Sequence, residues 1–204
     1  MSEHDYSNFS IVDLAGRVAT HLARHDIQVV LVGGLAVEIY TLNRYLTGDI
    51  DMVNTSINRP AALKKAMAEI GFQKQGRVFE NPTTNITVEF PSAPLAVGDE
   101  HIKEVTTCET AWGEIAILQA VDVVKDRLLA YLYWDDNQSA VQAITVALIH
   151  TISPVVLETL LADQGETQKG KVVLDTLTEA ATLPEPDMGA IEALFIKQLL
   201  AQRK

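Results

Sequence analysis

The order of apolar and polar residues predicts alternating helices and strands in the first third of the chain. Apolar residues recur at helical spacing after Ser10, which is a suitable N-cap. A β-branched run then ends at Gly33-Gly34, which indicates a short buried strand followed by a helix. The elements predicted here are a helix at 10–25, a strand at 28–32, a helix at 35–45, a strand at 50–53, and a helix at 59–70 that has Pro60 in its first turn and is followed by Gly71.

The rest of the chain changes from short strands to helices. Between residues 72 and 118, β-rich runs separated by Asn, Pro and Gly predict strands at 77–79, 86–90, 104–108 and 114–118. Helical spacing then predicts helices at 121–134, 138–150, 154–163, 171–181 and 188–202. This order favours an α+β fold, with a small mixed β-sheet core flanked by helices at residues 1–118 and a C-terminal helical region at residues 119–204.

Composition narrows the class of protein. With 204 residues, 48% of them hydrophobic and 21% charged, the chain is long and apolar enough for a sizeable core. It has no apolar run near the length of a membrane span, no signal-peptide pattern, and one cysteine, Cys108, so we expect a cytoplasmic protein outside the membrane. The net charge of −11 disfavours general nucleic-acid binding, although a local basic groove or bound divalent metal would offset it.

Two aspartates in the predicted strand at 50–53 and its approach are candidates for metal binding. Asp49 and Asp51 lie two residues apart, so on a strand they project from one face about 6–7 Å apart, while Ile50 and Met52 point into the core. Two carboxylates on one face repel each other unless a cation lies between them, and a divalent metal with oxygen ligands is the natural partner. A solvated strand edge or a turn explains the same pattern equally well.

Gly33-Gly34 is a candidate phosphate site. At the start of a helix the free backbone amides and the dipole attract an anion, and the missing side chains let a phosphate approach the backbone. An ordinary structural turn is the alternative. Together with Asp49 and Asp51, the glycines form the combination that phosphoryl or nucleotidyl transfer needs. Glu89, in the strand-like run at 86–90, is the best candidate for a third carboxylate, and an exposed glutamate on an edge strand is its alternative.

The stretch "LVGGLAVEIY…RYLTGDIDMV" resembles the nucleotidyltransferase superfamily of the DNA polymerase β type, in particular its minimal, AbiEii toxin-like branch. The pattern is an apolar residue and two small residues, a spacer, and then Asp-apolar-Asp, with further similarity to uncharacterised bacterial members to about residue 147. The spacer here is slightly long, Gly34 stands where many active relatives have Ser, and the third acid is Glu rather than the commoner Asp. The matching positions are Val32, Gly33, Gly34, Asp49, Ile50 and Asp51.

The resemblance implies a function and a set of roles. Gly33 and Gly34 would bind the triphosphate, Asp49 and Asp51 would hold Mg²⁺ or Mn²⁺, and Glu89 would be the third metal ligand and the general base. The reaction would move a nucleoside monophosphate from an NTP onto a hydroxyl of RNA, protein or a small molecule. The protein would act alone, as an oligomer, or with a cognate antitoxin or other partner protein. A non-catalytic member of the fold that binds nucleotide or another protein is the alternative.

Other residues have two interpretations each. Arg44 and Thr47 precede Asp49 as they do in the resembling branch and are candidate nucleotide contacts, although Arg44 also suits an ordinary surface position. Lys125 is a candidate triphosphate contact, and ion pairing with its neighbours on a helix surface is the alternative. Tyr131, Tyr133 and Trp134 suit either base stacking or an interhelical core.

The sequence gives little support for a histidine-based metal site or catalytic triad, or for a glycine-rich nucleotide-binding loop. The five histidines show no metal-ligand spacing and no place in a Ser/His/Asp arrangement. The glycine-rich loops of P-loop and Rossmann nucleotide-binding proteins do not occur in the sequence.

Overall fold

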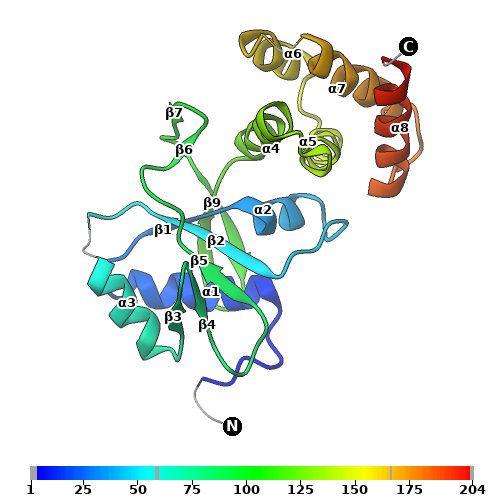
Figure 1. The fold of residues 1–204 in the computed structure, drawn as a ribbon. Coiled ribbons are helices and arrows are strands. Elements are labelled where there is room, and N and C mark those ends of the chain that lie inside the picture. The colour runs from blue at the N-terminus through cyan, green and yellow to red at the C-terminus, as the bar shows by residue number, and fades with distance from the viewer. Residues whose placement is uncertain (1–3, 58–59, 166, 203–204) are drawn as a thin grey trace. The chain divides into compact units, whose positions relative to one another are not determined.

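The computed structural model describes residues 4–57, 60–165 and 167–202, and the chain folds into two compact units. The first, which we call the sheet unit, consists of Met1–Ala36 and Leu46–Gln119. The second, the helical unit, consists of Val37–Tyr45 and Ala120–Lys204. The predicted α+β class with a mixed sheet is confirmed (Figure 1).

The sheet unit contains a mixed sheet that has seven strands in the described part of the chain, in the order β3-β4-β5-β2-β1-β9-β8. At its centre β2 runs antiparallel to β1 and parallel to β5, while β1 runs parallel to β9. The strands are β1 (Val29–Val32), β2 (Asp49–Asn54), β3 (Gln73–Gln75), β4 (Val78–Glu80), β5 (Thr87–Glu89), β8 (Thr106–Thr110) and β9 (Gly113–Ile117), and a separate hairpin pairs β6 (Ala96–Val97) with β7 (Glu100–His101).

Two helices, α1 (Ile11–Ala23) and α3 (Pro60–Glu69), pack together on the sheet (Figure 1). Ser10 caps α1 as predicted, because its hydroxyl accepts a hydrogen bond from the Asp13 backbone N–H at 3.1 Å. Leu14, Val18 and Leu22 form the fully buried side of α1. The predicted start of α3 at Arg59 lies outside the described residues.

The strands present an apolar face and a polar face. Register places Leu31 beside Met52, and Ile50 beside Val88, on the same face of the sheet, and all four side chains are 0–1% exposed. Because α1 contacts β1, β2 and β9, and α1 and α3 lie on one side of the sheet, we infer that these two helices cover this buried face (Figure 1). The alternate positions of β2 and β5 point to the opposite face, where Asp49, Asp51, Thr87 and Glu89 remain at least partly exposed, while Val53 is buried.

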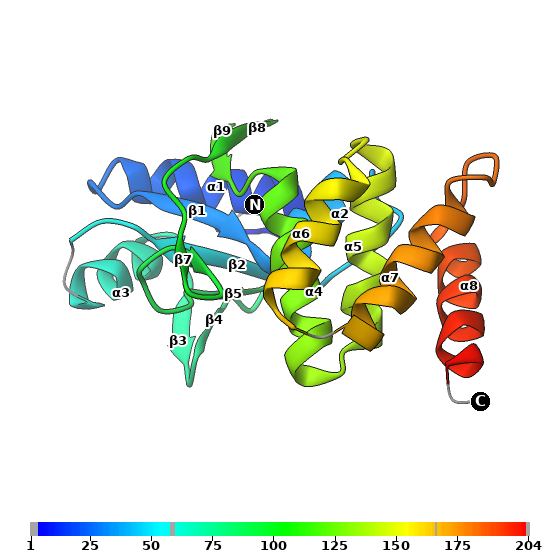
Figure 2. The same ribbon diagram turned by 90° about the horizontal axis from the view of Figure 1, so that it is seen from above.

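The helical unit is built from α4 (Ala120–Trp134), α5 (Asn137–Ile149), α6 (Pro154–Asp163), α7 (Thr167–Ala180) and α8 (Met188–Ala201). Within it α5 packs against α4, α7 and α8, and α6 packs against α7 (Figure 2). Its most buried side chains include Ile144, Leu157, Val173 and Phe195. The predicted helices of this region agree with the structure to within a few residues.

The helix α2 (Gly33–Tyr40) differs more from its prediction, which was 35–45. It begins at the glycines and ends five residues early. Leu42 and Asn43 have φ values of 53° and 62°, which a right-handed helix cannot contain. The sequence pattern also missed β3, β6 and β7, which are only two or three residues long.

Candidate functional site

Alternation along β2 sets the direction of the two aspartates. Ile50 and Met52 are fully buried, whereas Asp49 is exposed and Asp51 is partly buried. Both carboxylates therefore lie on the polar face of the sheet, opposite α1 and α3. The Thr87 hydroxyl on β5 donates a hydrogen bond of 2.7 Å to Oδ1 of Asp49, which fixes the orientation of that carboxylate.

Glu89 occupies the position next to Asp51 on the neighbouring strand. The parallel register of β2 and β5 pairs Asp51 with Glu89 directly, so both side chains leave the same face. Glu89 Oε1 lies 3.7 Å from Nε of Arg77, an 89% exposed side chain in the turn between β3 and β4. Among the described side chains, Asp49, Asp51 and Glu89 do not form a set whose oxygens all lie within 4.8 Å of one another.

The two glycines adjoin the aspartates in space. Gly33 has φ +66°, and a Cβ at this position would lie 2.3 Å from Oδ2 of Asp51. A Cβ at Gly34 would lie 3.1 Å from the Thr47 hydroxyl, which itself accepts a hydrogen bond of 3.3 Å from the Asp49 backbone N–H. Only glycine fits at position 33, both for its backbone conformation and for its contact with the carboxylate.

A pocket of about 450 Å³ is lined by residues of β3, β4, β5 and the loop between β4 and β5, and by none of the three carboxylates. Cross-strand pairing puts Gln73, Glu80 and Thr87 on the same face as Glu89. Thr87 therefore both lines the pocket and donates to Asp49. The pocket is lined by Gln73, Gln75, Glu80, Asn81, Pro82, Thr84, Asn85, Ile86 and Thr87, most of which offer hydrogen-bonding groups.

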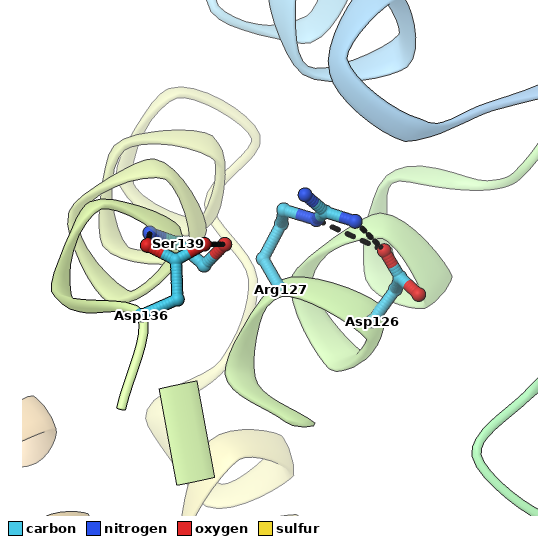
Figure 3. A network of polar contacts seen from close by, with 4 residues as sticks. All are labelled: Asp126, Arg127, Asp136 and Ser139. Carbon is cyan, nitrogen blue, oxygen red and sulfur yellow. Dashed lines mark hydrogen bonds and ion pairs between the residues drawn. The ribbon is translucent and has the colours of Figure 1, made fainter. Parts of the chain in front are cut away.

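Arg44 and Lys125 belong to the helical unit, whereas the other predicted site residues belong to the sheet unit. The Arg44 guanidinium is exposed and donates a hydrogen bond of 3.2 Å to the Pro186 carbonyl oxygen, at a pocket of about 180 Å³. Lys125 is partly buried on α4. Its neighbour Arg127 forms an ion pair with Asp126, with Nε 2.9 Å from Oδ2 (Figure 3).

The helical unit has a second short-range polar contact at the start of α5. Asp136 caps this helix, because its carboxylate accepts hydrogen bonds from the Ser139 backbone N–H at 3.2 Å and from the Ser139 hydroxyl at 2.8 Å (Figure 3). Both contacts in Figure 3 join residues that are close in sequence, so they support the helices locally.

The aromatic group of α4 divides between the core and the surface. Tyr131 is 2% exposed and meets Phe195 edge-on, with ring centroids 5.4 Å apart. Tyr133 and Trp134 are 62% and 81% exposed. Tyr131 therefore belongs to the interhelical core, the second of the two interpretations its position in the sequence allows.

Known proteins do not identify this chain. Comparisons with models of protein families, with curated proteins and with solved structures find no match. The described helices include none that is long and apolar enough to cross a bilayer.

Sequence reasoning missed one group of potential metal ligands. His21 and His25, which were not predicted to bind a metal, lie next to each other and to Glu69. The spacing of four residues between the histidines was the available signal, because residues so spaced share one side of a helix. Glu69 comes from α3, and no local pattern connects it with α1.

Proposed function

We propose that this protein is a divalent-metal-dependent nucleotidyltransferase that moves a nucleoside monophosphate from an NTP onto a hydroxyl of RNA, protein or a small molecule. It would act in the cytoplasm, alone or as one component of a toxin–antitoxin pair. One observation carries the proposal. Asp51 and Glu89 are register partners on parallel strands, Asp49 shares their face, and Gly33 adjoins the Asp51 carboxylate.

The residues present fit Mg²⁺ or Mn²⁺. The donor set of Asp49, Asp51 and Glu89 consists only of carboxylate oxygens, which such hard cations prefer. The absence of a side chain at Gly33 leaves space beside Asp51 that a Cβ would fill. When bound, the cation would neutralise charge on the triphosphate and on the departing pyrophosphate.

The chain's own residues have separate tasks in this proposal. The backbone amides at the start of α2, bare of side chains at Gly33 and Gly34, bind phosphate oxygens. The Thr87 hydroxyl holds Asp49 in place through its hydrogen bond of 2.7 Å. Glu89 leaves its contact with Arg77 when the acceptor substrate binds. Its carboxylate then takes the proton of the attacking hydroxyl. Catalysis is then mostly positioning and charge neutralisation.

The test is transfer of label from NTPs, with Mg²⁺ or Mn²⁺ and cell extract as the source of acceptors. The wild-type protein is compared with Asp49→Asn/Asp51→Asn, and with Glu109→Gln/Glu114→Gln as a control. Glu109 and Glu114 are directly paired, exposed carboxylates on β8 and β9, so the control removes the same charge from the same sheet. We expect labelling by the wild type and the control only. Equal labelling by all three proteins would rule out the mechanism.

A non-catalytic nucleotide-binding protein is the second candidate. It is favoured by the Arg77–Glu89 contact and by carboxylate oxygens that do not converge within 4.8 Å in the described structure. Thermal-shift measurements with each of the four NTPs, with and without Mg²⁺, distinguish the two. Stabilisation that depends on Asp49 and Asp51, without label transfer to any acceptor, would favour binding alone.

A further inference from the structure

A cluster of three potential metal ligands joins the two helices beneath the sheet. His21 lies in the last turn of α1, His25 lies just beyond its end, and Glu69 is the last residue of α3. The four-residue spacing places both imidazoles on one side of α1, where their ring centroids are 4.7 Å apart. Because α1 and α3 pack together, the Glu69 carboxylate reaches both rings.

The distances in the cluster suit a small, four-coordinate ion. Nε2 of His25 lies 2.9 Å and Nε2 of His21 lies 3.8 Å from Oε2 of Glu69, and the three residues offer ligand atoms within 4.8 Å of one another. Zinc ligands of this kind lie about 2.0–2.2 Å from the ion, so tetrahedral geometry separates them by roughly 3.4 Å. These two separations bracket that value, and all three ligand atoms lie within 4.8 Å of one another.

We propose that His21, His25 and Glu69 bind a borderline divalent transition-metal ion of the Zn²⁺ class. Two imidazole nitrogens and one carboxylate are typical ligands for such ions, whereas Mg²⁺ prefers oxygen alone. The site lies on the side of the sheet that α1 and α3 cover, opposite the face that carries Asp49 and Asp51. It is therefore separate from the proposed transfer site and does not depend on it.

Hydrogen bonds occupy the ligand atoms in the described structure. Nε2 of His21 lies 2.9 Å from the Ala66 carbonyl oxygen, and Nε2 of His25 lies 2.9 Å from the Glu69 carboxylate. Protons on these nitrogens make the contacts, and a metal ion would replace them. The side chains of His25 and Glu69 are 37% and 38% exposed, so an ion can enter from solvent and keep water in its remaining position.

The experiment is a calorimetric titration of the full-length, chelator-treated protein with Zn²⁺, and with Mg²⁺ for comparison. We expect one Zn²⁺ per chain in the wild type, and any heat of Mg²⁺ binding should be the same in His25→Ala as in the wild type. His25→Ala and Glu69→Gln should each weaken zinc binding at least about tenfold. Losing a residue that only hydrogen-bonds to a metal ligand already weakens binding by about tenfold or more, and these two variants remove a ligand itself. His101→Ala, which removes an exposed imidazole from β7, should bind as the wild type does.

Further measurements separate a loss of zinc binding from a loss of folding and from effects at the proposed transfer site. Circular dichroism shows whether each variant is folded, and Co²⁺ absorption shows whether a four-coordinate site forms and is lost in His25→Ala. Asp49→Asn/Asp51→Asn should retain full zinc affinity. Unchanged zinc affinity in folded His25→Ala and Glu69→Gln would overturn the proposal, as would loss of zinc binding in Asp49→Asn/Asp51→Asn or no zinc binding by the wild type.

Discussion

Replacing Gly33 by alanine tests the closest contact between the glycine pair and the carboxylates. The wild-type backbone has φ +66° at this position, and the new Cβ would lie 2.3 Å from Oδ2 of Asp51 and 3.0 Å from its Cβ and Cγ. Asp51 must therefore move, or the start of α2 must shift. Either change displaces the carboxylate from its position beside the first turn of the helix.

The expected loss of stability has two parts. A left-handed backbone conformation costs an L-residue roughly 1–2 kcal/mol. Relief of the clash by shifting packed atoms adds about 1–3 kcal/mol. Gly76→Ala separates the two, because Gly76 also has positive φ, +60°, but its Cβ would meet nothing within 4 Å. We expect Gly76→Ala to show the backbone cost alone and Gly33→Ala to exceed it by about 1–3 kcal/mol.

The assay is urea unfolding followed by tryptophan fluorescence in a Trp134→Phe background. Trp134 is 81% exposed in the helical unit, so its replacement should change little. The remaining tryptophan, Trp112, lies in the sheet unit and stacks on Phe9 with ring centroids 5.4 Å apart. Its signal therefore reports the unfolding of the unit that contains Gly33.

A double-mutant cycle with Asp51→Ala decides whether the clash is with the carboxylate. In the Asp51→Ala background the extra cost of Gly33→Ala should fall by more than about 0.5 kcal/mol, the usual lower bound for residues in contact. Two results would refute the reasoning. One is equal destabilisation by Gly33→Ala and Gly76→Ala, and the other is an undiminished cost of Gly33→Ala when Asp51 is absent.

Three further changes test other parts of the structure. Ser10→Ala should destabilise the sheet unit by about 1 kcal/mol in urea unfolding, because α1 loses its cap. Thr87→Val should weaken Mg²⁺ binding in a calorimetric titration while changing the free energy of unfolding by at most about 1 kcal/mol, and unchanged affinity would mean that Thr87 does not position Asp49. Burial, aided by the charge of Asp135, raises the pKa of Tyr131 to about 12, and its hydroxyl has no hydrogen-bond partner among the described residues. Tyr131→Phe should thus stabilise by about 1 kcal/mol at neutral pH. The raised pKa favours the neutral phenol in the fold, so above about pH 10 the wild type alone should lose further stability through this group, by up to about 1.4 kcal/mol per pH unit.

Local signals in the sequence were sufficient to predict most of the helices and the longer strands. The helical unit was predictable because its helices have long periodic patterns, and α6 begins at Pro154, a residue that suits the first turn of a helix. In the sheet unit, β1 followed from a β-branched run, and β2 followed from the alternation of its aspartates with the buried Ile50 and Met52. Strand order and the parallel pairing of β2 with β5 join segments far apart in the chain, so no local pattern specified them.

Short elements were the ones that sequence reasoning missed. The strand β3 has three exposed residues, Gln73–Gln75, and its place in the sheet comes only from pairing with β4. The hairpin of β6 and β7 has two residues in each strand. The end of α2 depended on left-handed conformations at Leu42 and Asn43, and leucine gives no signal for such a conformation.

The two candidate sites differ in how far their residues are spread along the chain. Asp49 and Asp51 share a strand, so alternation alone predicted their common face, and the structure needed only to add Glu89 through register. His21 and His25 share the end of a helix, but the spacing acquires meaning only when Glu69 arrives from α3. Two carboxylates on one face of a strand repel each other, which suggests a bound cation, whereas two imidazoles on one side of a helix give no such signal. Like charges that are close in sequence therefore indicate a candidate site from the sequence alone. Ligands that come from separate segments can be recognised only in the packed structure.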